Sequence, residues 1–358
     1  MLSQLQLNME LITKFFKEQE IKTMMNNSMN NNGANNNGGR FTMVNGSIQT
    51  IELFATTVKS AVETYYGDDV RAEIHNVTKN NGLKLTGITI KDKSCNTAPT
   101  IYLEGFYMEY QSGRDMASIC QKIFKLYEDN RLAEDFDTTC ITEFERAKTK
   151  VCFKLVNAEK NKNLLQNAPH LMIHDLAIIF YVMVSGELDG IGSVTITNHI
   201  QEMWGVDTDT LFAFARTNSQ RLLKGQVQSM MNVMMDIVAE HADEVDEELI
   251  DTVFDIYVEE EGAVSPMYVA SNRNKVNGAS VILYSGLLKG FADKINDSFY
   301  ILPSSVHEVL FVPASTGPDA ECLKEMVYDV NRTQVAEDEI LSDHIYYYDR
   351  EADYVEML

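Results

Sequence analysis

The chain has 358 residues, of which 45% are hydrophobic and 23% are charged, as in a globular protein large enough for two cores. Its formal net charge is −23, from 30 Lys and Arg against 53 Asp and Glu. Such a surface repels phosphate backbones and anionic lipid headgroups, so we expect neither nucleic acid nor a membrane as partner.

Cysteine usage and apolar runs indicate the compartment. The five cysteines are scattered without a C-x-x-C pair, which favours a reducing environment. The N-terminus carries Glu10 and lacks an apolar core followed by a small-residue cleavage site, so we expect no signal peptide. The longest apolar run, 176–184, is about half the length of a membrane-spanning helix. We therefore expect a cytoplasmic protein.

Residues 1–46 differ in composition from the rest of the chain. Their first part places Leu5, Ile12 and Phe16 on one helical stripe. The Asn-rich run 25–39 that follows has no apolar pattern. The sequence therefore predicts a leading helix and a disordered tether over 1–46.

Residues 47–138 predict a small module. Apolar residues recur at helical spacing at both ends of it, and two alternating runs between them flank an Asn-Asn-Gly turn. Gly87 interrupts the second run, as a β-bulge would. The predicted elements are a helix over 51–65, strands over 70–78 and 83–90, and a helix over 116–127.

Residues 139–358 predict a larger domain of strands separated by short helices. The predicted strands are 150–157, 171–184, 194–197, 266–271, 279–284, 299–302, 306–312 and 344–348. The predicted helices are 198–204, one capped by Asp207, a Met-rich helix that includes Val227, and 319–331. The class is α+β: an N-terminal α-β-β-α module followed by a larger mixed-sheet domain with short helices.

A short internal echo appears when the chain is compared with itself at an offset of 87 residues. It aligns 192–196 with 279–283, two runs of small and β-branched residues. Each copy would comprise strand, loop, strand and short helix. The echo predicts a duplication within the larger domain.

Acidic residues cluster in one stretch of the larger domain. Between Lys224 and Arg273 there is no Lys or Arg, while Asp and Glu occur twelve times. A solvated helix face and loop is the ordinary interpretation. The alternatives are a docking surface for a basic protein and a loose cation site.

His170 and His174 are the nearest approach to a metal-binding pair. Residues four apart share a face in a helix and in a strand alike. Zinc sites need three or four ligands, and the sequence supplies no third one nearby. Two polar residues at the entrance of a strand explain the pair equally well.

The segment 302–308 combines hydroxyl, imidazole and carboxylate side chains. A catalytic interpretation makes Ser304 or Ser305 the nucleophile, His307 its base and Glu308 the orienting acid. Adjacent strand residues face opposite sides, however, so His307 and Glu308 do not readily form a dyad. Turn formation by the two serines is the alternative.

The polar loop 272–278 (NRNKVNG) carries two cations, Arg273 and Lys275. On so acidic a protein, a local basic loop is a candidate site for a small anionic ligand. Its terminal Asn-Gly is also an ordinary turn signal that needs no ligand.

Several segments together resemble a known family. They are ETYYGDD, KNNGLKLTGITI, PTIYLEGFY, HDLAIIFYVMV, ITNHIQEMWGVDTDTLFAFA, NKVNGASVILY, FYILPSSVHEVLFVP and LSDHIYYYDR. From about 51 to 350 the chain resembles an uncharacterised bacterial family, domain of unknown function 5688. Its middle strands have a fainter similarity to domain of unknown function 1444. The resemblance implies a bacterial protein and brings no activity, cofactor or catalytic residue.

The sequence favours a non-enzymatic cytoplasmic binding or regulatory protein that acts through protein contacts. Nucleotide-binding and hydrolase signatures are absent from the chain, and we expect no cofactor. A basic protein is the expected partner. The first alternative is a hydrolase of unrecognised type centred on the 302–308 turn, and the second is small-anion binding by the 272–278 loop. The oligomeric state stays open.

Overall fold

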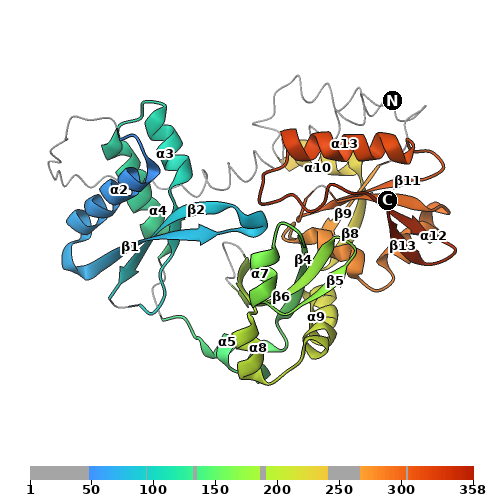
Figure 1. The fold of residues 1–358 in the computed structure, drawn as a ribbon, viewed down its shortest axis with the longest axis horizontal. Helices are drawn as coiled ribbons and strands as arrows, with labels where there is room; N and C mark the ends of the chain where they lie inside the picture. Colours follow the sequence, from blue (N-terminus) through green and yellow to red (C-terminus); the bar gives the residue numbers. More distant parts are fainter. Residues whose placement is uncertain (1–47, 94, 132–134, 186–190, 241–266, 304) are drawn as a thin grey trace. The chain divides into compact units, whose positions relative to one another are not determined.

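The computed structural model describes residues 48–93, 95–131, 135–185, 191–240, 267–303 and 305–358 (Figure 1). The predicted leading helix and tether, and the acidic residues of 241–266, lie outside the described residues. The described chain divides into two compact units, with the boundary between Thr138 and Thr139. We describe each unit by itself.

The N-terminal unit packs helices against one face of a three-stranded antiparallel sheet of order β1-β2-β3. The structure adds a short third strand and an extra helix to the predicted order, because a three-residue strand is too short to show a pattern. The elements are α2 (Ile51–Tyr66), η1 (Gly67–Asp69), β1 (Val70–Thr78), η2 (Asn80–Gly82), β2 (Lys84–Asp92), β3 (Thr100–Tyr102), α3 (Glu104–Gln111) and α4 (Met116–Asn130).

The predicted hairpin of this unit is confirmed, but the predicted bulge at Gly87 is wrong. β1 and β2 pair in continuous register over nine residues, with His75 opposite Gly87. Gly87 also lies opposite Tyr102 of β3. A Cβ atom at Gly87 would come within 2.6 Å of the Thr100 Cγ2 atom. The close approach of β3, rather than a bulge, explains the glycine.

The C-terminal unit contains two antiparallel sheets. One has the order β13-β12-β10-β11-β9-β8, and the other has the order β4-β6-β5 with β7 also paired to β6. The strands are β4 (Val151–Asn157), β5 (His170–Ile173), β6 (Leu176–Ser185), β7 (Ile191–Thr195), β8 (Gly225–Ser229), β9 (Tyr268–Asn272), β10 (Phe299–Leu302), β11 (Val309–Pro313), β12 (Tyr346–Asp349) and β13 (Tyr354–Met357). The helices are α5 (Thr139–Thr142), α6 (Phe144–Ala147), α7 (Lys162–Asn167), α8 (Asn198–Trp204), α9 (Thr208–Leu222), α10 (Met230–Glu240), η3 (Gly278–Leu283), α12 (Leu287–Ile295) and α13 (Ala320–Thr333).

The α+β class is therefore confirmed. The strand pairings of the described residues are antiparallel, which is more regular than the mixed sheet that the sequence predicts. No helix of the described residues combines the length and the apolar character that crossing a membrane requires.

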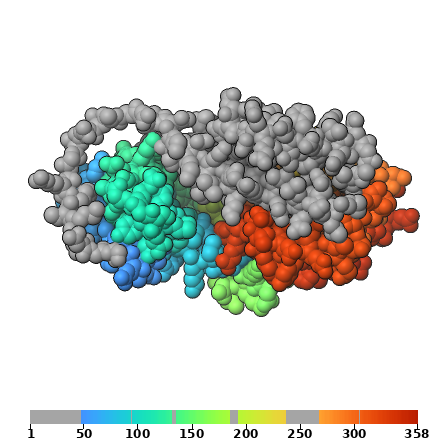
Figure 2. Space-filling view, turned by 90° about the horizontal axis from the view of Figure 1, so that it is seen from above, coloured from blue at the N-terminus to red at the C-terminus, as the bar shows by residue number. Residues whose placement is uncertain are grey.

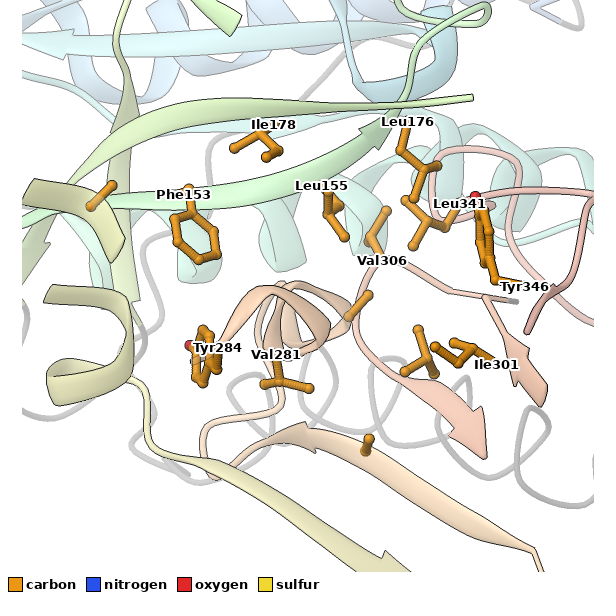
Figure 3. Close-up of a cluster of buried hydrophobic side chains, with 14 of the residues drawn as sticks. Phe153, Leu155, Leu176, Ile178, Val281, Tyr284, Ile301, Val306, Leu341 and Tyr346 are labelled. Atoms are coloured by element: carbon orange, nitrogen blue, oxygen red, sulfur yellow. The ribbon is translucent and has the colours of Figure 1, made fainter. Parts of the chain in front are cut away.

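One large apolar core lies between the two sheets of the C-terminal unit (Figure 3). Phe153 and Ile178 come from the smaller sheet, and Ile301 comes from the larger one. Val281 of η3 and Tyr284 fill the space between them. Burial of these side chains supplies the main stabilisation of the unit.

Helices α10 and α13 cover the opposite face of the six-stranded sheet (Figure 1). Their buried side chains are absent from the core between the sheets, whereas α10 contacts β8 and β9, and α13 contacts β10. Both helices therefore lie on the far side of that sheet from η3. Their buried residues are Met230, Met231, Val233 and Met234 of α10, and Leu323, Met326, Val327, Val330 and Asn331 of α13.

Side-chain caps begin three of the helices in this unit. Thr197, Asp207 and Asp319 each accept a hydrogen bond from the backbone N–H three residues ahead, as N-cap residues do. Gly205 ends α8 in the left-handed conformation, with φ of 65°. The predicted helix over 198–204 and the predicted cap at Asp207 are confirmed.

Three predictions in this unit are wrong. The run 171–184 is two strands, because His174 has a φ of 52° and turns the chain between β5 and β6. The run 279–284, predicted as a strand, lies mostly in the 3₁₀ helix η3. The N-cap of this helix, Asn277, has a left-handed backbone with a φ of 51°. Val227 lies in β8 rather than in the Met-rich helix.

The prediction of a duplication within this unit is also wrong, because its two copies have different secondary structure. The first copy of the echo, 192–196, falls on β7, whereas its counterpart is the 3₁₀ helix η3. The similarity of the two runs is one of composition, since Val, Ile and small residues suit both settings.

Candidate functional site

Two of the sequence candidates, the loop 272–278 and the segment 302–308, meet around His307. The His307 Nδ1 atom lies 3.1 Å from the Lys275 carbonyl oxygen and 3.4 Å from the Asn277 nitrogen. The Nε2 atom lies 3.7 Å from the Glu339 Oε1 atom. The side chain of His307 is 28% exposed, and that of Glu339 is 23% exposed. The imidazole thus joins the loop to a carboxylate that the sequence does not single out.

Close backbone packing fixes the same junction. A Cβ atom at Gly278 would come within 2.0 Å of the Ser271 Oγ atom and 2.2 Å of the His307 carbonyl oxygen. The Ser271 hydroxyl donates a 2.7 Å hydrogen bond to that carbonyl oxygen. Only glycine fits at this position, so loop and turn form one rigid junction.

Of the two serines in this segment, the structure describes Ser305, whose hydroxyl bonds to the main chain of the turn. Ser304 lies outside the described residues. The Ser305 Oγ atom accepts a 3.0 Å hydrogen bond from the His307 main-chain N–H, and Ser305 forms a bridge with Ile340. Glu308 is half-buried just before β11. A nucleophile activated by the imidazole needs a bond to the ring, whereas the Ser305 hydroxyl stabilises the turn.

The cations of the loop, Arg273 and Lys275, are both exposed. The loop backbone is held internally, because the Asn272 Oδ1 atom accepts hydrogen bonds from the nitrogens of Asn274 at 3.0 Å and Val276 at 3.4 Å. These amides serve the turn, as in other Asx turns, instead of facing outward toward an anion.

The two histidines of the predicted metal pair make separate contacts. The His170 Nδ1 atom lies 2.9 Å from the Ala168 carbonyl oxygen. The His174 ring centroid lies 5.6 Å from that of Tyr346. Within the described ranges there is no group of three or more His, Cys, Asp or Glu residues arranged to hold a metal ion.

Asp175, next to His174, gathers three polar partners from a distant part of the chain. The Ser342 hydroxyl donates to its Oδ2 atom at 2.6 Å, and the Tyr346 hydroxyl donates to its Oδ1 atom. The His344 Nδ1 atom lies 3.2 Å from the Oδ2 atom. Burial and the neighbouring carboxylate both raise the pKa of Tyr346 above its usual range. Sequence reasoning missed this group, because no local pattern joins residues so far apart.

The chemistry of this group differs from that of a Ser-His-Asp triad. Asp175 orients the imidazole of His344, whose side chain is 52% exposed, but Ser342 is fully buried and bonds to the carboxylate instead of the ring. The carboxylate ties the β5–β6 turn to the segment that leads into β12. The geometry assigns it a structural role.

The outer face of α13 carries acidic and aromatic side chains. Tyr328 is 50% exposed, and the Arg332 guanidinium carbon lies 3.2 Å from its ring centroid. The Glu321 side chain is 81% exposed. We call this stripe the α13 surface; its members are Glu321, Glu325, Tyr328, Asp329 and Arg332.

Helix α10, on the same side of the sheet as α13, also has exposed apolar and acidic side chains. Met235 is 38% exposed and precedes Asp236, the first residue of the acidic stretch.

Asp319, the N-cap of α13, accepts a hydrogen bond from the Cys322 backbone, which lowers the pKa of its carboxyl. An exposed ring among carboxylates is the chemistry that binds cationic side chains.

The model of a family of unknown function, DUF5688, matches residues 51–350, which is most of the chain. No curated protein and no solved structure matches the chain.

Proposed function

Because the chain belongs to the DUF5688 family, whose function is unknown, we propose its function from geometry: it is a non-enzymatic binding or regulatory protein that recognises a basic protein partner through the α13 surface. The observation that carries the proposal is the half-exposed ring of Tyr328 within an acidic stripe. The proposal places the protein in a bacterial cytoplasm.

The α13 surface combines the two features that protein recognition uses. An aromatic ring supplies contact area, and surrounding carboxylates attract and orient a cationic partner. Arg332 already rests on one side of Tyr328 at 3.2 Å, so this ring accommodates a guanidinium group. The net charge of −23 adds long-range attraction for a basic protein.

The polar groups around His307 and Asp175 make their contacts within the fold. His307 holds the loop 272–278, and Ser305 stabilises its own turn. Asp175 ties together two distant segments. These polar groups bond within the fold, whereas the ring of Tyr328 and the carboxylate of Glu321 are exposed.

The test uses the full chain and a fluorescently labelled peptide that alternates Arg with Leu, followed by fluorescence anisotropy. Glu321→Lys should weaken binding about three- to tenfold at low salt, since charges at an interface rim act mainly through long-range attraction. Raising the salt concentration should reduce the difference between the variant and the parent chain.

Glu159→Lys is the matched control. Glu159 pairs with Lys162 three residues ahead, as Glu321 pairs with Lys324, and its side chain is 79% exposed against 81%. Both substitutions change the net charge equally. Equal loss of binding in the two variants would show attraction by net charge alone and would reject the α13 surface as the site.

A further inference from the structure

β1 forms an edge of the sheet in the N-terminal unit. In the part of the chain that the structure describes, it pairs with β2 on one side and with no strand on the other. Natural edge strands are guarded by bulges, prolines or charged side chains, especially lysine. β1 has no proline and no lysine, its register with β2 is continuous over nine residues, and its charged side chains are Arg71 and Glu73. Its Glu73 forms ion pairs with Arg71 at 3.2 Å and with Lys91 of β2 at 2.8 Å.

Two hydrogen bonds fix which residues of β1 point their backbone groups outward. The Lys79 nitrogen donates to the Leu83 carbonyl oxygen at 2.7 Å, and the Lys93 nitrogen donates to the Asp69 carbonyl oxygen at 3.2 Å. Hydrogen-bonded and non-hydrogen-bonded pairs alternate in an antiparallel ladder, so odd-numbered residues of β1 bond to β2. The residues that point outward are Val70, Ala72, Ile74, Asn76 and Thr78.

We propose that β1 pairs antiparallel with β1 of a second copy of this chain, about a two-fold axis at Ile74. Ile74 is the middle residue of the nine in β1, so this register pairs the strand over its whole length. The backbone N–H and C=O groups of Ile74 point outward, so the two copies exchange both hydrogen bonds there. The two sheets join into one continuous sheet, the closed arrangement that a two-fold dimer requires.

The side chains agree with this register. Ile74, which is 36% exposed, meets Ile74 of the second copy and buries apolar surface. Glu73 stands opposite His75 of the second copy, and this contact occurs twice. No like charges face each other directly. Two-fold axes at Ala72 or Asn76 leave the strand ends overhanging and pair fewer residues.

The net charge sets the strength and the salt dependence of the dimer. Two copies that each carry a formal charge of −23 repel each other, and added salt screens this repulsion. The dimer is therefore a weak one at low salt, and it becomes stronger as the salt concentration rises. Association through the α13 surface with a basic partner has the opposite salt dependence.

Disulfide trapping in the full chain tests the register. Cα atoms of a hydrogen-bonded antiparallel pair lie about 5.5 Å apart, within the range that a disulfide spans. Ile74→Cys should therefore give a disulfide-linked dimer under mild oxidation, at least about tenfold above the parent chain with its five native cysteines. Mass spectrometry of the linked peptide identifies the bond.

Asn76→Cys is the matched control on the same face of the strand. In the proposed register the two copies of residue 76 lie four positions apart, about 13 Å, which is too far for a disulfide. Absence of a disulfide between copies of the Ile74→Cys variant, or equal trapping by Asn76→Cys, overturns the proposal.

Sedimentation of the unmodified chain at rising concentration and high salt gives an independent readout. The chain should shift from monomer to dimer, and Ile74→Lys should abolish the shift because it places two ammonium groups opposite each other. Thr56→Lys, at an exposed position of α2, should leave it unchanged. A chain that stays monomeric, or a shift that survives Ile74→Lys, contradicts the dimer.

Discussion

The hydroxyl of Ser342 donates a 2.6 Å hydrogen bond to the carboxylate of Asp175, across 167 positions of the sequence. The same carboxylate receives the hydroxyl of Tyr346, which lies in the core between the two sheets. Asp175 thereby fixes the β5–β6 turn of the smaller sheet to β12 of the larger one. This polar contact joins the two sheets in addition to the apolar packing between them.

Removing the charge at Asp175 should destabilise the C-terminal unit. We expect Asp175→Asn to lower the free energy of unfolding by about 1–3 kcal/mol, because the amide keeps one acceptor oxygen and turns a donor NH2 group toward the other buried hydroxyl. Urea unfolding followed by the fluorescence of Trp204, the single tryptophan of the chain, measures this unit. His344→Ala is the control and should cost less than about 1 kcal/mol, since that side chain is 52% exposed.

The junction at Gly278 should tolerate no side chain. Gly278→Ala forces a Cβ atom to within 2.0 Å of the Ser271 Oγ atom, so we expect a loss of more than about 3 kcal/mol or failure to fold. Gly290→Ala in α12 meets no atom within 4 Å and should instead stabilise the unit by about 0.5–1 kcal/mol. Equal melting temperatures of the two variants would contradict the rigid junction.

Burial of Cys152 should make the C-terminal unit sensitive to alkaline pH. Burial raises the pKa of its thiol from 9.0 to about 11. The unfolded chain therefore loses this proton first, so the stabilisation is complete below pH 9.0 and decreases as the pH rises toward about 11.

At pH 10 this linkage should cost about 1 kcal/mol relative to pH 8. Urea unfolding of Cys152→Ala at the two pH values should show a smaller decrease than the parent chain shows. Burial also raises the pKa values of Tyr181 and Tyr284 above 10.0, but both phenols are present in the two proteins and contribute equally to the decrease in each. An identical decrease in both proteins would show that Cys152 is not the titrating group.

Tyr328 should dominate binding of the basic peptide at the α13 surface. We expect Tyr328→Ala to weaken binding by about 1–2 kcal/mol, or roughly five- to thirtyfold, through loss of ring contact and cation–π attraction. Tyr328→Phe should keep most of the affinity, because the ring remains. Anisotropy titrations at one salt concentration compare the three proteins, and weak binding by the Phe variant would contradict a contact made through the ring.

Local signals in the sequence were sufficient for several elements. Helix α8 begins after Thr197 and ends at Gly205, where the sequence predicts it. Asn80-Asn81-Gly82 turns the chain between β1 and β2. Capping and turn chemistry act within a few residues, so a single sequence reveals them. The α+β class follows from the same signals.

Tertiary contacts decide the parts that the sequence did not predict. The run 171–184 gives no local sign of a turn, because the turn at His174-Asp175 is held by distant residues: Tyr346 of β12 and Ser342 in the segment before it. The run 279–284 has strand composition, but the packing of Gly278 against His307 directs the chain into η3.

For the candidate site, too, the sequence indicates single residues, whereas the fold determines which of them lie together. The sequence marks His307 and the loop 272–278 as separate candidates, and only the fold brings them together with Glu339. Glu321, Tyr328 and Asp329 belong to an ordinary amphipathic pattern, in which an exposed ring and exposed charges carry no special signal. The α13 surface becomes visible once the buried face of the helix is known.

The most direct test of protein recognition by the α13 surface is photocrosslinking in cells of the native host, with a benzophenone side chain at position 328. The same group at position 354 is the control, because Tyr354 is 60% exposed on β13, in the same unit. We predict that the group at position 328 captures one defined protein rich in Lys and Arg, and that the group at position 354 does not. No adduct at position 328, or the same adducts at both positions, would contradict this function.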